Sequence, residues 1–216
     1  MKKIRYLYIS IASIILFVLW TIAVCFIDVK AVGPENSVVG FSTLNTLFHN
    51  ITGVNMWLYA VTDWLSIIPL CIVIGFALLG LLQLIKRKNL FRVDYDILML
   101  GIFYIVVFSV FIFFEVFPVN YRPVLIEGIL EASYPSSTTM LVLCVMPTAY
   151  IQLNKRINDI KFKKYVLVFI ITFTVFMVSG RILSGVHWIT DIIGGCLISC
   201  GLVNMYCYLT DTKTDL

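Results

Sequence analysis

Residues 6–27, YLYISIASIILFVLWTIAVCFI, form a run of apolar and small polar residues without a single charge. A helix needs about 20 such residues to cross the hydrocarbon core of a bilayer, which is about 30 Å thick. Basic residues at positions 2, 3 and 5 precede the run, as they do in a signal peptide. However, the run exceeds the ~7–15 apolar residues of a signal peptide and lacks a small-residue cleavage site. We therefore expect it to form the first membrane-spanning helix.

The rest of the chain has the same apolar character. Of the 216 residues, 61% are hydrophobic and 13% are charged, whereas soluble domains have about 45–50% and about 25%. Further charge-free runs of spanning length occupy residues 64–85, 97–114, 132–154, 165–180 and 192–210. We expect an all-α, polytopic integral membrane protein in which six transmembrane helices form one bundle. Residues 1–216 are treated as a single membrane domain.

The basic residues gather on one side of this predicted bundle. If six spans place both termini on the same side, 13 of the 16 lysines and arginines lie there. The positive-inside rule assigns that side to the cytoplasm. The net charge of +4 is therefore a signal of membrane topology, and it argues against a nucleic-acid-binding surface.

The other side of the predicted bundle keeps only Lys30, Arg122 and Arg181 among its basic residues. Several acids and both histidines lie near the outer ends of spans, where a charge is costly unless it faces a partner or a polar cavity. Asp63 is one of these acids, and it could line such a cavity or serve as a structural carboxylate. We expect a polar site on the extracytoplasmic face.

The connection before the last span, SGRILSGVHWITDIIGG, places Arg181, His187 and Asp191 within eleven residues. If the helix has begun at residue 187, His187 and Asp191 lie one turn apart. The carboxylate can then accept a hydrogen bond from one imidazole nitrogen and leave the other as an oriented nucleophile or base. A helix-capping cluster is the alternative. Arg122 in VNYRPVLIEG favours the chemical interpretation, because guanidinium groups suit phosphate oxygens.

A second polar stretch, EASYPSSTTMLVL, begins the fourth charge-free run at residues 131–143. Pro135 and Ser136 suit a helix start at which the serine hydroxyl caps the first turn. The free N–H groups and the positive dipole end of that helix would form an outward-facing anion site, to which the hydroxyls of residues 136–139 add donors. Simple capping of a transmembrane helix is the alternative.

These residues resemble the type 2 phosphatidic acid phosphatase family, which is related to the vanadium haloperoxidases. The family's third motif, S-R-x5-H-x3-D, appears here as Arg181-x5-His187-x3-Asp191, with Gly180 inserted before the arginine. The resemblance covers the six-span layout and the motif-bearing half, residues 115–195. It implies that His187 attacks phosphorus to form a phosphohistidine, that Asp191 orients His187, and that Arg181 holds phosphate oxygens. It implies no cofactor and no metal ion.

The family's other two motifs, K-x6-R-P and P-S-G-H, are altered in this chain. The first is reduced to Arg122-Pro123, and Glu115 stands where the family has its lysine. The second reads P-S-S-T at residues 135–138, so Thr138 replaces the histidine that protonates the leaving oxygen. The resemblance implies a phosphate site made of Arg122, Ser136, Ser137 and Thr138. A threonine hydroxyl cannot act as the acid near neutral pH, and general acid catalysis contributes about 10²–10⁴-fold.

Three hypotheses accommodate the missing acid. Glu115, Glu127 or Glu131 could replace it, since apolar surroundings favour the protonated form of a carboxyl group. Alternatively, the substrate is a lipid diphosphate, whose leaving phosphate needs less help than an alkoxide. Finally, the protein could bind or transport lipid phosphates without turnover. We expect a metal-independent lipid phosphatase in the bilayer, acting on a phosphatidate, phosphatidylglycerol phosphate or polyprenyl diphosphate, with the binding or transport protein as the alternative.

Overall fold

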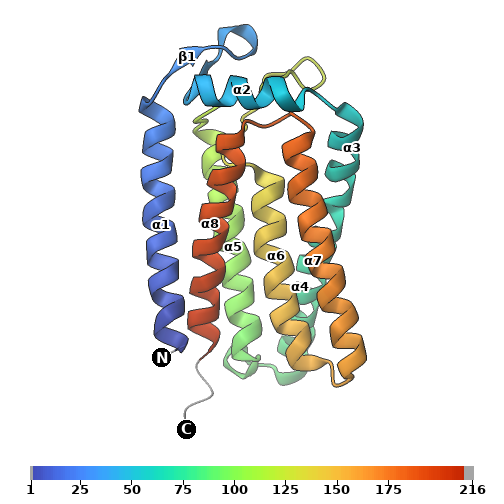
Figure 1. Cartoon of the computed structure of the whole chain (residues 1–216). Coiled ribbons are helices and arrows are strands. Elements are labelled where there is room, and N and C mark those ends of the chain that lie inside the picture. Colours follow the sequence, from blue (N-terminus) through green and yellow to red (C-terminus); the bar gives the residue numbers. More distant parts are fainter. Residues whose placement is uncertain (1, 212–216) are drawn as a thin grey trace.

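The computed structural model describes residues 2–211, which form a bundle of long helices aligned side by side (Figure 1). The long helices are α1 (Lys2–Phe26), α4 (Ile67–Arg87), α5 (Tyr95–Val116), α6 (Ser137–Arg156), α7 (Ile160–Leu183) and α8 (Ile189–Thr210). The short elements are β1 (Lys30–Ala31), η1 (Pro34–Asn36), β2 (Val38–Val39), α2 (Ser42–Thr52), α3 (Met56–Leu65) and η2 (Leu90–Arg92). Strands β1 and β2 pair antiparallel, with Lys30 opposite Val39. The predicted all-α bundle is confirmed.

Five segments of the described chain are long and apolar enough to cross a bilayer. They are Lys3–Phe26, Met56–Arg87, Tyr95–Val116, Ile160–Leu183 and Ile189–Thr210. The second segment joins α3 and α4 across Ser66, so it begins eight residues before the predicted span at residues 64–85. Large apolar side chains are exposed along α1, α4, α5 and α7, as the hydrocarbon of a membrane requires. The protein is a multi-pass membrane protein.

Helix α6 is the sixth long helix and lies inside the bundle. It packs against α4, α5, α7 and α8, and its buried residues include the polar Thr148 and Gln152. Because protein surrounds this helix, its sequence need not be as apolar as that of the lipid-facing helices. It begins at Ser137, whereas the charge-free run begins at residue 132, so the residues between them belong to a loop at the end of the bundle.

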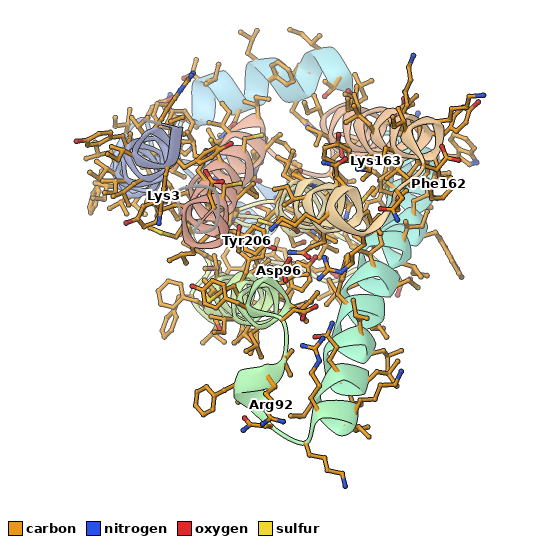
Figure 2. The ribbon with its side chains drawn as sticks, turned by 90° about the horizontal axis from the view of Figure 1, so that it is seen from below. Lys3, Arg92, Asp96, Phe162, Lys163 and Tyr206 are labelled. Atoms are coloured by element: carbon orange, nitrogen blue, oxygen red, sulfur yellow. The ribbon has the colours of Figure 1, made fainter. Side chains whose placement is uncertain are left out.

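The two ends of the bundle differ in character. The start of α1 and the last turn of α8 lie at the same end (Figure 1). Figure 2 views this end from below, with the basic residues Lys3, Arg92 and Lys163 around it and Asp96 and Tyr206 nearer the middle. Helix α2 and the β1–β2 hairpin cover the opposite end (Figure 1). We call the first the basic end and the second the site end.

Candidate active site

Arg181, in the last turn of α7, is buried at the site end with 1% of its surface exposed. Its Nη2 donates to Oγ1 of Thr138 at 2.5 Å and to Oδ1 of Asp63 at 3.3 Å. Its Nη1 donates to Oγ1 of Thr62 at 3.4 Å, and its guanidinium carbon lies 4.9 Å from the centre of the Tyr59 ring. Helix α3 therefore supplies three of the four side chains that hold this arginine.

Arg122 reaches the same place from the hairpin between α5 and α6. The hairpin turns at Glu127 and Gly128, whose φ angles of 50° and 80° suit a type I′ turn. Nε of Arg122 lies 2.9 Å from Oε2 of Glu131, and its guanidinium carbon lies 5.7 Å from the centre of the Tyr59 ring. Two arginines thus flank one tyrosine, and each is paired with one carboxylate.

His187 lies in the short loop between α7 and α8, with 5% of its surface exposed. Gly185 lets this loop pass close to the turn after α2: its φ is +65°, and a Cβ there would lie 1.8 Å from the Gly53 carbonyl oxygen. The Ser184 carbonyl also accepts a hydrogen bond from the N–H of Asn55 at 2.9 Å. These contacts fix the loop that carries His187.

The predicted hydrogen bond between His187 and Asp191 is not formed. Nδ1 of His187 lies 3.8 Å from Oδ2 of Asp191, which is too long for a hydrogen bond but within electrostatic range. Helix α8 begins at Ile189, so His187 precedes it and the pair lacks the helical geometry that the spacing suggested. Asp191 instead accepts hydrogen bonds from the Trp188 N–H at 3.0 Å and from Nδ2 of Asn120 at 3.3 Å.

The imidazole of His187 is neutral in this environment. Its burial, together with the positive charges of Arg122 and Arg181, lowers its pKa well below the usual 6.5. Nε2 of His187 lies 3.4 Å from Nη1 of Arg122. Because arginine can only donate hydrogen bonds, Nε2 carries the lone pair and the ring proton resides on Nδ1, on the side of Asp191. A neutral imidazole is a competent nucleophile once its lone pair is free, and here Arg122 covers the lone pair of Nε2.

The start of α6 meets the start of α8 at this site. Ser136 is the N-cap residue of α6, as predicted, but its hydroxyl donates to Oγ1 of Thr139 at 3.0 Å instead of capping the backbone. The Ser136 N–H donates to the Asp191 carbonyl at 3.0 Å, so the serine is enclosed between the two helices. Ser137 and Thr138 instead line a cavity, beside the first N–H groups of α6, which have no intrahelical acceptor.

This cavity, of about 270 Å³, has one polar and one apolar wall. Its polar residues are Asp63, Ser66, Arg122, Ser137, Thr138 and Arg181. Its apolar residues are Leu70, Val107, Phe108, Phe111, Met140 and Leu141. His187 is not among the lining residues and lies behind Arg122. The cavity can therefore hold an anionic group on one side and hydrocarbon on the other.

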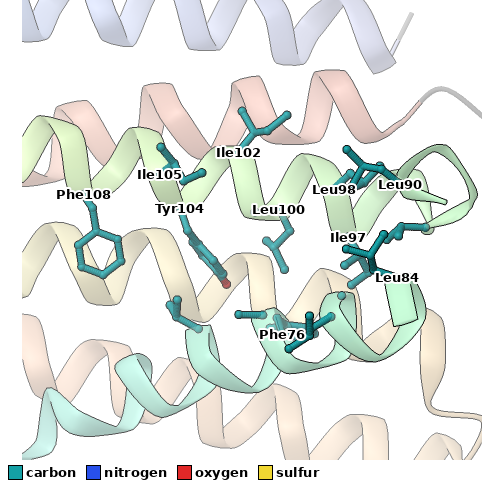
Figure 3. Close-up of a pocket in the computed structure, with 16 residues that line it drawn as sticks. Phe76, Leu84, Leu90, Ile97, Leu98, Leu100, Ile102, Tyr104, Ile105 and Phe108 are labelled. Atoms are coloured by element: carbon teal, nitrogen blue, oxygen red, sulfur yellow. The ribbon is translucent and has the colours of Figure 1, made fainter. Parts of the chain in front are cut away.

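A second, wholly hydrophobic groove of about 480 Å³ runs between α4 and α5 (Figure 3). Phe76 and Leu84 of α4 face Ile97, Leu100 and Tyr104 of α5 across it. Phe108 lines both this groove and the polar cavity, so the two adjoin. The groove extends from there to Leu90 and Val93 at the basic end.

The three predicted replacement acids occupy different places. Glu131 lies at the site, in its ion pair with Arg122. Glu127 is exposed at the tip of the hairpin turn, and Glu115 is exposed in the last turn of α5. Neither of these two lines the cavity that contains both arginines.

The structure also adds residues of α3 that the motifs did not indicate. Tyr59, Thr62 and Asp63 contact Arg181 across more than 100 residues of sequence. The sequence indicated Asp63 as an acid near the outer end of a predicted span, but it left the role of Asp63 open. Nothing in the sequence indicated Tyr59 or Thr62, because tyrosine and threonine are ordinary residues at such a position. The fold and this cluster together define a membrane protein with two buried arginines beside a polar cavity at one end of its bundle.

Comparisons with known proteins narrow this class. Residues 109–215 match the family model of the PAP2 superfamily. The whole fold is similar to the crystal structure of a transmembrane PAP2-type phosphatidylglycerolphosphate phosphatase from Bacillus subtilis, with a TM-score of 0.69 and 17% sequence identity over 97% of this chain and 99% of that one. No curated protein matches the sequence. The chain belongs to the PAP2 superfamily.

Proposed function

We propose that this protein is a metal-independent phosphatase that hydrolyses a phosphomonoester or diphosphate on a membrane lipid, with His187 as the nucleophile. One observation carries the proposal: two buried arginines, Arg122 and Arg181, converge beside a neutral imidazole. Their present carboxylate partners, Glu131 and Asp63, are partly exposed, so an anionic ligand has access to both buried guanidinium groups. Arginine forks suit the oxygens of a phosphoryl group, which carry the developing charge in its transfer.

The geometry gives each residue a role in two chemical steps. A bound phosphoryl group takes over Nη1 of Arg122, which releases the Nε2 lone pair of His187. Nε2 attacks phosphorus, the bond from phosphorus to the lipid oxygen breaks, and a phosphohistidine forms. Water then cleaves the P–N bond and releases phosphate. Asp191 stabilises the charge that develops on the ring, from 3.8 Å.

The phosphoryl oxygens are stabilised by fixed donors at the polar wall. Arg122 and Arg181 supply charge, and the N-terminus of α6 supplies N–H groups together with the hydroxyls of Ser137 and Thr138. Ser136 contributes through the placement of its backbone, because its own hydroxyl is bonded to Thr139.

The hydrophobic surroundings support a lipid as the substrate. The apolar wall of the cavity adjoins the groove between α4 and α5, which can accept a hydrocarbon chain (Figure 3). This favours phosphatidate, phosphatidylglycerol phosphate or a polyprenyl diphosphate over a soluble phosphate ester. The positive-inside rule places the basic end in the cytoplasm, so the termini are cytoplasmic and the site faces the extracytoplasmic side.

The test is release of phosphate by the purified full-length protein from vesicles that contain each of these three lipids in turn. We expect turnover of at least one, and an acid-labile phosphoenzyme when the phosphate carries a radiolabel. His187→Ala should abolish both signals while the variant still unfolds cooperatively. Undiminished turnover by this variant would exclude the covalent mechanism.

One observation favours a second candidate, a protein that binds or transports lipid phosphates without hydrolysing them. Thr138 stands at the family's acid position, and Arg122 covers the lone pair of His187 at 3.4 Å. Such a protein should bind lipid phosphate saturably and release no phosphate, and Arg122→Ala or Arg181→Ala should weaken that binding. Phosphate release that depends on His187 would eliminate this candidate.

A further inference from the structure

Helix α3 contributes an acidic residue to the polar cavity, in which the second motif places no proton donor. Among the described residues that line the polar cavity, Asp63 is the only one with a carboxyl group. Its side chain is 55% exposed, so it is open to a ligand. Glu131, by contrast, is joined to Arg122 at 2.9 Å, and it does not line this cavity.

Asp63 lies beside the position from which the family's histidine acts. Oδ1 of Asp63 and Oγ1 of Thr138 both accept hydrogen bonds from the same atom, Nη2 of Arg181, at 3.3 Å and 2.5 Å. The carboxyl group and the threonine hydroxyl therefore face one point in the cavity. A carboxyl group at residue 63 therefore lies close to the position at which the family has its proton donor.

The direction of the reaction also calls for an acid on this wall. His187 is not among the residues that line the cavity, and its Nε2 lies 3.4 Å from Nη1 of Arg122, which does line it. In an in-line transfer the leaving oxygen departs opposite the attacking nitrogen, so an attack by His187 directs that oxygen into the cavity. Asp63 lines this cavity together with Leu70, Phe108 and Phe111.

The charges around Asp63 change when a phosphate binds. In the free protein, Arg181 of α7 faces it at 3.3 Å, and Arg122, which pairs with Glu131, lies 5.7 Å from the centre of the Tyr59 ring. Helix α6 contributes the hydroxyls of Ser137 and Thr138 and its first N–H groups to this wall, and none of these groups is charged. A phosphate monoanion that binds both arginines brings its own acidic proton next to the Asp63 carboxylate.

The geometry points to Asp63 as the general acid of the reaction, an inference that rests on the proposed phosphatase function. As Nε2 of His187 forms its bond to phosphorus, the bond to the lipid oxygen breaks and that oxygen takes the proton of the Asp63 carboxyl group. In the second step, the Asp63 carboxylate takes a proton from the water that attacks the phosphohistidine. Phosphate takes this proton from Asp63 and leaves, which restores His187 and the ion pair between Asp63 and Arg181.

The experiment compares two substrates that differ in their need for an acid. The leaving group of phosphatidate is the alkoxide of diacylglycerol, which needs protonation. The leaving group of 4-nitrophenyl phosphate is a stable phenolate, which does not. We expect Asp63→Asn, which keeps an oxygen for Arg181, to lose about 10²–10⁴-fold in kcat on phosphatidate. The same variant should lose little on the aryl ester, and Asp63→Glu should recover part of the activity on phosphatidate.

Glu131→Gln is the matched control, because it alters the carboxylate that pairs with the other arginine. We expect it to slow both substrates by the same factor, since Glu131 acts only through Arg122. Equal losses on both substrates in Asp63→Asn would show that Asp63 merely holds Arg181, and would overturn the inference. So would full activity of Asp63→Asn on phosphatidate, or a loss confined to phosphatidate in Glu131→Gln. Failure of the proposed function is distinct, because the wild type would then release no phosphate from any of the three lipids or from the aryl ester, and both proposals would fall.

Discussion

The two ends of the bundle both pair acids with bases, but only the site end buries one partner of each arginine–carboxylate pair. At the basic end, Arg87 meets Asp94 at 2.8 Å, and Asp96 meets Lys155 at 3.5 Å and Arg156 at 3.4 Å. These pairs join the ends of α4, α5 and α6. Their side chains are partly exposed on both sides of each pair, as is typical of ion pairs at a protein surface.

At the site end the two arginines of the candidate site are buried, and their carboxylate partners are not. The side chains of Arg122 and Arg181 are 9% and 2% exposed, whereas those of their partners, Glu131 and Asp63, are 36% and 55% exposed. In the interior, the guanidinium group of Arg181 is held by Tyr59 and by the hydroxyls of Thr62 and Thr138. Its carboxylate partner, Asp63, is exposed enough for another anion to bind the arginine in its place. The comparison teaches that burial, more than the number of pairs, separates a ligand site from a set of structural ion pairs.

The largest effect should come from exchanging a buried arginine while keeping its charge. Arg181→Lys cannot contact Thr62, Thr138 and Asp63 together, because an ammonium group lacks the planar fork. We expect kcat/KM for the best lipid substrate to fall about 10²–10³-fold, as when one oxyanion donor is removed.

Arg156→Lys is the matched exchange at the basic end, and it should leave phosphate release unchanged. Both variants should show cooperative thermal unfolding in detergent. If the two variants lose activity equally, the contrast between the ends has no functional meaning.

A smaller effect should come from the residue behind the site. Nδ2 of Asn120 donates to Oδ1 of Asp191 at 3.3 Å, while its own Oδ1 accepts from the Gly40 N–H at 3.3 Å. Asn120→Ala leaves a buried carboxylate short of a donor, which costs about 1–3 kcal/mol. Chemical unfolding should measure this loss. Unchanged stability would mean that water replaces the amide. The buried carboxylate at the site end would then be as tolerant of a lost partner as the exposed pairs of the basic end.

The sequence predicted most of the fold for a simple reason. A charge-free run of spanning length is a local property. The number of basic residues on alternate loops predicts which helix ends lie on the same side of the membrane. The same reasoning found Arg122, Arg181 and His187, which the structure brings together at one end. The local sequence pattern was sufficient to predict those features that the membrane imposes, which do not depend on tertiary contacts.

What the sequence did not predict depends on contacts between distant helices. Tyr59 and Asp63 reach Arg181 because α3 packs against α7, which no spacing rule contains. The hydrogen bond between His187 and Asp191 was predicted wrongly because the helix start was placed two residues too early. The side-chain cap of Ser136 was predicted wrongly because the packing of α8 directs its hydroxyl to Thr139.

The pH dependence of stability should also distinguish the two ends. Burial and two arginines lower the pKa of His187, so the unfolded chain, with an ordinary pKa of about 6.5, binds its proton first as the pH falls. The native state therefore loses up to about 1.4 kcal/mol per pH unit below about pH 6.5, until the native imidazole is protonated as well. The free energy of unfolding of His187→Gln should therefore fall less than that of the wild type between pH 7.5 and pH 5. His49, whose pKa burial also lowers, contributes equally to both proteins.

A steeper loss in the variant than in the wild type would contradict a neutral His187. The wild type should also keep its phosphate release below pH 6.5, because the neutral imidazole persists there in the native state. A fall in activity centred on pH 6.5 would mean that the buried arginines do not depress the pKa of this ring.

The smallest effect should come from the basic end itself. The hydrogen bond from Arg87 lowers the pKa of Asp94, so the pair contributes stability above the ordinary pKa of the acid and loses it only in acid. With 42% and 40% of the side chains exposed, water screens most of this interaction, and Asp94→Asn should cost less than about 1 kcal/mol at neutral pH. Phosphate release should not change. A cost as large as that of Asn120→Ala would show that the basic end is also an energetic centre of the fold, and that burial is a poorer guide to function than the comparison of the two ends suggests.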